Sequence, residues 1–309
     1  MGSSGRKRFF KDSKPNDIKA ELRKEEQRTL NQAFDANVAE RLDKLLEAAN
    51  QRDTTAIQDA IEEIKTALAT DIESTFDAKF GGSVRKRTFV DGISDIDVLV
   101  ILKDPELRSS SPQEVLEYFE TQVREHMKGW EVSRGTLALT LIRQGLEIQI
   151  LPAVRENGTT HIPGARGNEW SDINPEKFFR QLTDVNGKFG NKVVPVIKLA
   201  KIINSQQPAP LQLSGYHLES LAVEAFRSYK GLLNPKAMLE HFFDRSRELV
   251  LSPIKDSTGQ SVHVDSDLGP ANSGNRRAVS AALDRVHRRM RNADASGSVD
   301  QWLEPFGDE

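Results

Sequence analysis

Residues 81–102 of this chain read GGSVRKRTFVDGISDIDVLVIL. A Gly-Gly-Ser turn and a short basic connection precede a β-branched, apolar strand that carries two carboxylates at its start. Asp95 and Asp97 are two residues apart, so on a strand their side chains point to the same side of the sheet. Two like charges beside isoleucine and valine repel each other unless a cation lies between them. Oxygen ligands favour Mg²⁺ or Mn²⁺, so the stretch predicts a divalent cation site, with Gly82 and Ser83 offering N–H groups and a hydroxyl to phosphate oxygens.

The spacing of these residues resembles a known signature, which runs as Gly82-Ser83-x-x-x-Arg87-Thr88-x-x-x-x-x-Ser94-Asp95-Ile96-Asp97-Val98-Leu99-Val100. It is similar to that of the polymerase-β-like nucleotidyltransferase superfamily. Within it, the signature resembles the cGAS/DncV-like nucleotidyltransferases (CD-NTases), the bacterial cyclic-oligonucleotide synthases of CBASS anti-phage systems. Supporting stretches are Leu151-Pro152-Ala153 and Ser214-Gly215-Tyr216-His217-Leu218-Glu219, and the resemblance covers roughly residues 60–285.

The resemblance implies an α/β (α+β) fold, in which a polymerase-β-like nucleotidyltransferase core with a small mixed sheet precedes a helical C-terminal lobe. We expect a mobile arm at 1–16, the core with long N-terminal helices at 17–190, a helical lobe like that of oligoadenylate synthetase at 191–291, and a tail at 292–309.

The implied activity is synthesis of a cyclic di- or trinucleotide second messenger from nucleoside triphosphates. Asp95 and Asp97 would hold Mg²⁺ or Mn²⁺ for two-metal nucleotidyl transfer, and Ser83 with the Gly82 amide would position the donor triphosphate. The implied partners are ATP and other triphosphates (GTP, CTP, UTP), an effector that the cyclic product activates, and a regulatory partner.

The position of the third carboxylate holds an amide. In the resembling family an acidic residue stands three positions before the Pro-Ala pair, and here that residue is Gln149. An amide oxygen can bind a cation, but it brings no negative charge and accepts protons poorly. Three explanations remain open. Glu147, on the same strand face and roughly 6–7 Å away, replaces position 149 as a metal ligand; or the protein is naturally inactive or uses one fully held metal. The third is that residue 149 was changed deliberately to trap substrate. Glu147 can equally be a solvated strand residue.

Several further residues are candidates for nucleotide contacts. Lys198 and Lys201 are three apart on a predicted helix, so both can face one triphosphate, or both can lie on a solvated face. The family resemblance adds Ser214 as a triphosphate contact and Tyr216 as a platform for base stacking. We interpret His217 as a structural histidine rather than a catalytic base.

Two basic clusters remain. Arg85, Lys86 and Arg87 lie between the turn and the aspartates, where they can touch phosphates or an acceptor nucleotide. A C-terminal run can bind RNA or a partner, or form a solvated helix face; it consists of Arg276, Arg277, Arg285, Arg288, Arg289 and Arg291.

The composition is that of an ordinary soluble protein, with 29% charged and 37% hydrophobic residues and a net charge of −3. This charge gives no overall attraction to nucleic acid or an anionic membrane. The absence of cysteine excludes disulfides and thiolate zinc sites. Without a signal peptide or a long apolar run, we expect a cytoplasmic protein that does not engage a membrane.

Apolar periodicity predicts the remaining elements. We expect helices over 30–46, 57–76, 112–127, 193–203, 216–229 and 234–249, and strands over 130–132, 136–143 and 146–151. Residues 105–112 are expected to form a Ser-rich loop, and 154–175 an irregular excursion.

Two other functions compete with cyclic synthesis. One is a linear nucleotidyltransferase that acts on RNA, a protein or a small molecule. The other is a catalytically inactive homologue that binds nucleotide or RNA as a sensor, which Gln149 would explain.

Overall fold

The computed structural model describes residues 15–50, 54–69, 77–80, 86–90, 96–102, 104–156, 159–164, 167–173, 175–258 and 263–307. Within these ranges no helix combines the length and the apolar character needed to cross a membrane.

A seven-stranded mixed sheet forms the first half of the molecule. The strands are β1 (Asp77–Phe80), β2 (Ile96–Leu102), β3 (Glu131–Arg134), β4 (Leu139–Arg143), β5 (Leu146–Glu156), β6 (Thr159–Pro163) and β7 (Trp170–Ile173). Their order is β1-β2-β5-β4-β3, with β6 paired to β5 and to β7. Of the pairs, β2 and β5 run parallel and the others antiparallel. The predicted fold class, a small mixed sheet with many helices, is confirmed.

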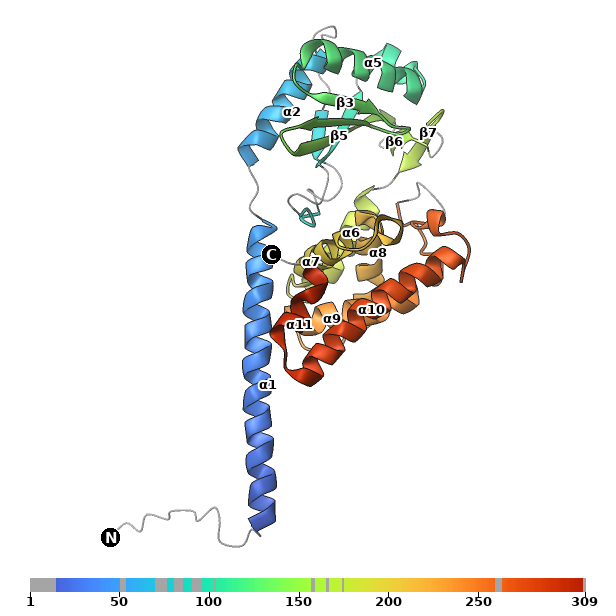
Figure 1. Cartoon of the computed structure of the whole chain (residues 1–309). Helices are drawn as coiled ribbons and strands as arrows, with labels where there is room; N and C mark the ends of the chain where they lie inside the picture. Colours follow the sequence, from blue (N-terminus) through green and yellow to red (C-terminus); the bar gives the residue numbers. More distant parts are fainter. Residues whose placement is uncertain are drawn as a thin grey trace, which may run out of the picture.

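Helices α2 (Thr54–Ala69) and α5 (Pro112–His126) cover one face of this sheet (Figure 1). Ser111 begins α5 with a capping box to Glu114, and Pro112 supplies the fixed φ of the first turn. The apolar stripes of both helices pack on the alternate strand residues that point toward them, among them Val98 and Ile150. We call this sheet with its covering helices the sheet lobe.

The remaining helices form a second lobe with its own hydrophobic core, which we call the helical lobe (Figure 1). They are α1 (Pro15–Ala48), α6 (Pro175–Lys188), α7 (Val193–Ser205), α8 (Gly215–Phe226), α9 (Pro235–Leu249), α10 (Gly274–Ser296) and α11 (Val299–Leu303), with short 3₁₀ turns at Ala209–Leu211, Ser266–Leu268 and Glu304–Phe306. The N-terminal half of α1 projects beyond the lobe, and Leu30 on it is exposed although it begins the predicted apolar stripe.

Two expectations about irregular segments were wrong. Residues 105–112 contain the short helix α4 (Pro105–Ser109), which Asp104 caps by accepting two backbone N–H bonds. The predicted excursion at 154–175 is largely regular, because β5 continues to Glu156 and β6 and β7 form a hairpin on its end. Helix α6, which begins where that segment ends, was not predicted.

The hydrophobic contacts divide the chain differently from the expected domains. Phe34, Val38 and Leu42 of α1 and Phe178 of α6 belong to the core of the helical lobe, although the sequence assigned both segments to the first domain. The expected tail at 292–309 includes the end of α10 and all of α11, and Trp302 there is fully buried in the same core. Two segments distant in sequence therefore complete the helical lobe.

Candidate active site

Strands β2 and β5 run parallel and bring Asp97 of the acidic motif beside Gln149, the position where the resembling family has a carboxylate. Asp97 pairs with Gln149 in the register of these strands, and Thr140 of β4 pairs with Gln149 from the other side. Because strand residues alternate between faces, positions 97, 140 and 149 share the face opposite α2 and α5. The sheet face turned away from its covering helices therefore carries the candidate site.

Of the other predicted ligands, Glu147 lies within the described residues and can be compared with this geometry. Glu147 lies two residues before Gln149 and is partly buried, like Gln149 itself. Asp95, Gly82 and Ser83 lie outside the described residues. Among the residues that are described, no three His, Asp or Glu side chains gather closely enough to hold a metal ion.

The donor set that can be placed still fits a hard cation. An aspartate position, an amide oxygen and a glutamate follow one another on one sheet face, and all are oxygen donors. Together with Asp95, this set suits Mg²⁺ or Mn²⁺ rather than a metal that prefers nitrogen or sulfur. The residues present therefore fit the cofactor that the motif predicts.

The two lysines of α7 both contact residues outside the core of the helical lobe. Lys198 donates a hydrogen bond to the side-chain oxygen of Asn50, just after α1. Lys201 is only 4% exposed, and its Nζ atom lies 3.0 Å from the carbonyl oxygen of Thr88 and 3.1 Å from Oε1 of Glu219. In this structure Lys201 thus bonds within the protein, and its contact with a triphosphate stays a prediction.

Glu219 lies at the centre of these contacts, and our sequence reasoning gave it no role. Its carboxylate accepts hydrogen bonds from Lys86, Thr88 and Lys201, and the side chain is 1% exposed. Burial alone would raise the pKa of this carboxyl, but the neighbouring ammonium groups of Lys86 and Lys201 hold it below its ordinary value. The available signal was a carboxylate in the run 218–223 of α8, which has no other charge and is mostly apolar; once buried, such a carboxylate requires a cationic partner.

The residues at the start of α8 have structural contacts. Ser214 caps the helix by accepting a hydrogen bond from the backbone N–H of His217. The Tyr216 hydroxyl donates to Oδ1 of Asp256 at 2.8 Å, and its ring meets that of Phe178 edge-on with the centroids 4.7 Å apart. Burial and the Asp256 carboxylate raise the pKa of Tyr216, so its hydroxyl remains protonated. A contact with phosphate or base stays a prediction for both residues.

The structure places His217 in a buried cluster. Its Nε2 atom lies 3.5 Å from Oδ2 of Asp265, and burial lowers the pKa of the imidazole. Asp265 in turn pairs with Arg276 at 2.6 Å, and both side chains are fully buried. Arg276 also donates to the carbonyl oxygens of Gly269 and Val250. Arg276 is therefore a structural residue and not part of a surface for RNA.

Most other arginines of the C-terminal run have partners in the helical lobe. Arg288, Arg289 and Arg291 form ion pairs with Asp284, Glu304 and Glu240 respectively. Of the other basic cluster, Lys86 binds Glu219, Arg87 is exposed, and Arg85 lies outside the described residues.

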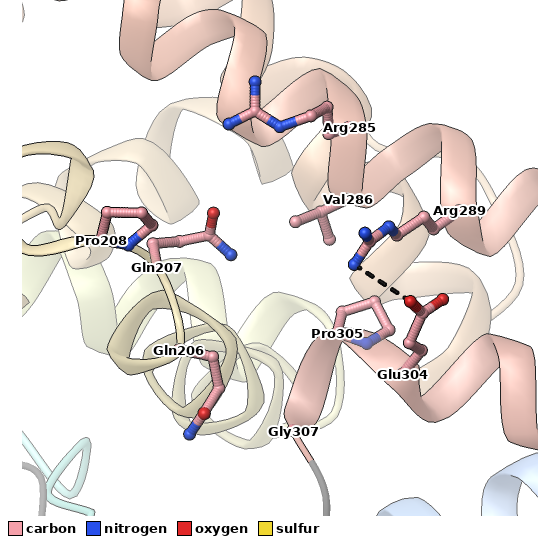
Figure 2. Close-up of a pocket in the computed structure, with 9 residues that line it drawn as sticks. All are labelled: Gln206, Gln207, Pro208, Arg285, Val286, Arg289, Glu304, Pro305 and Gly307. Carbon is pink, nitrogen blue, oxygen red and sulfur yellow. Dashed lines mark ion pairs between the residues drawn. The ribbon is translucent and has the colours of Figure 1, made fainter.

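A cavity of about 350 Å³ lies between the C-terminal end of α7 and α10 (Figure 2). The Arg289–Glu304 ion pair, 3.5 Å long, crosses one side of it, and Arg285 lies on the same helix face. All of its lining residues belong to the helical lobe, and none is a predicted nucleotide or metal contact, although Arg285 and Arg289 belong to the C-terminal basic run. The lining residues are Gln206, Gln207, Pro208, Arg285, Val286, Arg289, Glu304, Pro305 and Gly307. We assign this cavity no part in nucleotidyl transfer.

Comparison with known proteins identifies the class. Residues 37–186 match the family profile of the Second Messenger Oligonucleotide or Dinucleotide Synthetase domain. No curated protein matches the sequence at a significant level.

Solved structures share the fold across nearly the whole chain. Vibrio cholerae DncV cyclic AMP-GMP synthase, in complex with nonhydrolyzable GTP, superposes with a TM-score of 0.61 at 14% identity, covering 97% of this chain and 91% of its own. Escherichia coli MS115-1 CdnC, in its complex with HORMA-deltaN, gives 0.60 at 16% identity over 89% and 96%. CdnG of Bradyrhizobium diazoefficiens, in complex with GTP, gives 0.59 at 15% identity over 83% and 90%.

The fold is that of a nucleotidyltransferase, and the profile match falls within it. More particularly, residues 37–186 carry the match to the synthetase domain, and the resemblance to the cGAS/DncV-like (CD-NTase) family noted in the sequence is confirmed.

Proposed function

We propose that this protein joins nucleoside triphosphates into a cyclic di- or trinucleotide that activates an effector in anti-phage defence in the bacterial cytoplasm. The observation that carries the proposal is the pairing of Asp97 with Gln149 on the parallel strands β2 and β5, inside the synthetase domain match. The register puts position 97 on the sheet face turned away from α2 and α5, which supports a nucleotide site there.

The proposed substrates are ATP and other nucleoside triphosphates. Structures of relatives support this choice, because CdnC was solved with ATP and CdnG with GTP. Gly82 and Ser83 would bind the donor triphosphate with Lys198, Lys201 and Ser214, and Tyr216 would stack on a base. The complex of CdnC with HORMA-deltaN supports a regulatory partner for this chain as well.

In each transfer, the ribose hydroxyl oxygen of one nucleotide bonds to the α-phosphorus of the other. The bond to the pyrophosphate oxygen breaks, and the hydroxyl proton passes to a carboxylate oxygen or to solvent. Bound Mg²⁺ would activate the hydroxyl and neutralise the leaving pyrophosphate. Asp95 and Asp97 would hold the cation, with Gln149 or Glu147 supplying a further oxygen. A second transfer, without release of the linear intermediate, closes the ring.

Gln149 favours one alternative, a homologue that binds nucleotide without turning it over. A neutral amide at the paired position removes one negative charge from the cation site and provides no strong proton acceptor. In that case the protein would act as a nucleotide sensor.

Product analysis separates these functions. The chain is incubated with four labelled triphosphates and Mg²⁺ or Mn²⁺, and the products are treated with phosphatase. A cyclic synthase yields a resistant product, which the double variant Asp95→Asn/Asp97→Asn no longer makes. Products that lose terminal phosphate indicate a linear transferase, nucleotide binding without turnover indicates the sensor, and unchanged synthesis by the double variant overturns the assigned site.

A further inference from the structure

The two lobes meet at a buried group of charges that we call the Glu219 junction: Glu219, Lys201, Lys86 and Thr88. Glu219 and Lys201 come from α8 and α7 of the helical lobe. Lys86 and Thr88 come from the segment 86–90, which leads in sequence from the Gly-Ser turn toward the acidic strand β2. All four side chains are at most 14% exposed.

The junction holds this segment at three points. Glu219 binds the Lys86 ammonium group and the Thr88 hydroxyl, and Lys201 donates to the Thr88 carbonyl oxygen at 3.0 Å. Side chain and backbone of the segment are therefore both fixed. Such an arrangement defines position more closely than a single ion pair, because each charged partner is buried and satisfied.

The backbone between these points is in a disfavoured conformation. Arg87 has φ of +60°, in the left-handed region that residues other than glycine rarely adopt. A residue stays in this region only where the surrounding structure holds it, and such residues cluster at functional sites. Lys86 and Thr88, on either side of Arg87, are the residues that the junction holds.

The charges make Glu219 the critical member. Its ionised carboxylate lies between the two ammonium groups of Lys86 and Lys201. Without that charge, two buried cations would face each other and the segment would lose the attraction that keeps it on α8. Lys201 alone could retain only the carbonyl contact with Thr88.

We propose that Glu219 is a positioning residue that fixes the segment 86–88 against α7 and α8 of the helical lobe, and thereby anchors the part of the chain that leads in sequence toward the acidic strand β2. The expected effect on nucleotide binding rests on the proposed function, whereas the expected effect on the position of segment 86–88 does not. Glu219 would not touch the nucleotide. It would act through Lys86, Thr88 and Lys201.

The test compares four variants of the full chain. Glu219→Gln removes the charge with little change of shape, and Thr88→Val removes the hydroxyl while keeping the volume. Lys236→Met serves as the matched control, because Lys236 also bridges elements by ion pairs in the helical lobe but has no contact with the junction among its described ion pairs. Thr88→Ser restores the donor.

Hydrogen–deuterium exchange and nucleotide affinity are the two readouts. We expect exchange in peptides that contain residues 86–90 to rise about tenfold in Glu219→Gln and Thr88→Val, with α9 and α10 unchanged, since a hydrogen bond to a charged group is worth about that factor or more. The KM for triphosphate should rise by about tenfold, with kcat changed less. Thr88→Ser should restore both, and Lys236→Met should lower the melting temperature without changing either.

Exchange that stays unchanged in peptides that contain residues 86–90, or that rises equally across both lobes, would overturn the positioning role. If the natural chain neither binds nor converts triphosphates, the proposed function fails, while the exchange comparison still decides the role of Glu219.

Discussion

Asp97 on β2 and Gln149 on β5 occupy paired positions in two parallel strands. Paired positions on neighbouring strands lie roughly 4.7–4.9 Å apart and share a face of the sheet. A carboxylate at position 149 would therefore be close enough to bind the same cation as position 97. The amide of Gln149 leaves this site with one negative charge fewer.

Restoring that charge should strengthen metal binding. We expect Gln149→Asp to bind Mn²⁺ about tenfold more tightly or better, because affinity for hard cations rises with the number of charged oxygen ligands. Titration calorimetry with Mn²⁺ measures this without turnover. Gln149→Asn keeps an amide and should bind like the natural chain; equal affinities for all three proteins would show that position 149 does not face the cation.

Glu147 is the nearest candidate to replace the missing carboxylate. If it does so, Glu147→Gln should weaken Mn²⁺ binding and lower any synthesis by about tenfold to a hundredfold. Glu156→Gln is the matched control, since Glu156 lies at the other end of β5 and its ion pair among the described residues is the exposed one with Arg108. Equal metal affinities for the two variants would indicate a solvated strand residue at 147.

Lys236 of α9 connects distant parts of the helical lobe. Its Nζ atom lies 2.7 Å from Asp294 of α10 and 3.2 Å from Asp35 of α1. Although burial alone would lower it, the pKa of Lys236 is raised by these two carboxylates. We expect Lys236→Met to reduce the free energy of unfolding by about 1–3 kcal/mol, measured by urea denaturation.

The exposed pair of Lys44 with Glu40 on α1 provides the comparison. Lys44→Met should change stability little, because solvent screens an exposed ion pair. A loss as large as that of Lys236→Met would mean that α1 is held by general charge effects and not by the Lys236 bridge.

The lowered pKa of His217 predicts that the stability of the protein depends on pH. Burial lowers the pKa of its imidazole, although Asp265 and Asp267 oppose this shift. Below the ordinary histidine pKa of about 6.5, the unfolded chain therefore binds a proton that the folded chain does not. The stability is present above that pH and is lost as the pH falls toward the lowered folded value.

The variant His217→Gln removes this titration. Between pH 7 and pH 5, its free energy of unfolding should fall less steeply, by up to about 1.4 kcal/mol per pH unit. The lowered pKa of His287 persists in both proteins and leaves a residual slope. Identical slopes would show that His217 takes up a proton without unfolding.

Much of the sheet lobe could be predicted from local pattern. Each of the elements concerned has one buried face, and the spacing of apolar residues along the sequence reveals it. This holds for the helical stripes of α2 and α5 and for the alternation along β4 and β5. The acidic motif at β2 could be recognised because two aspartates interrupt an apolar strand. Position 149 came from the family resemblance, and its parallel pairing with Asp97 was not predicted from the sequence.

The Glu219 junction could not be predicted in this way. Lys86 and Glu219 are separated by 133 positions, and no local period connects them. The sequence left Lys201 either as a triphosphate contact or on a solvated helix face; it is buried, because Glu219 and Thr88 supply its partners. The C-terminal helix α11 was missed for a similar reason, since Trp302 finds its contacts only in a core built by distant helices.

The most direct test of the central claim is the phosphatase-resistant product made from labelled triphosphates with Mg²⁺ or Mn²⁺ by the natural chain and by Gln149→Asp. We predict a resistant product from Gln149→Asp in a larger amount than from the natural chain, and none from Gln149→Asp that also carries Asp97→Asn. Resistant product that persists with Asp97→Asn, or its absence from both the natural chain and Gln149→Asp, would contradict synthesis at the paired strands.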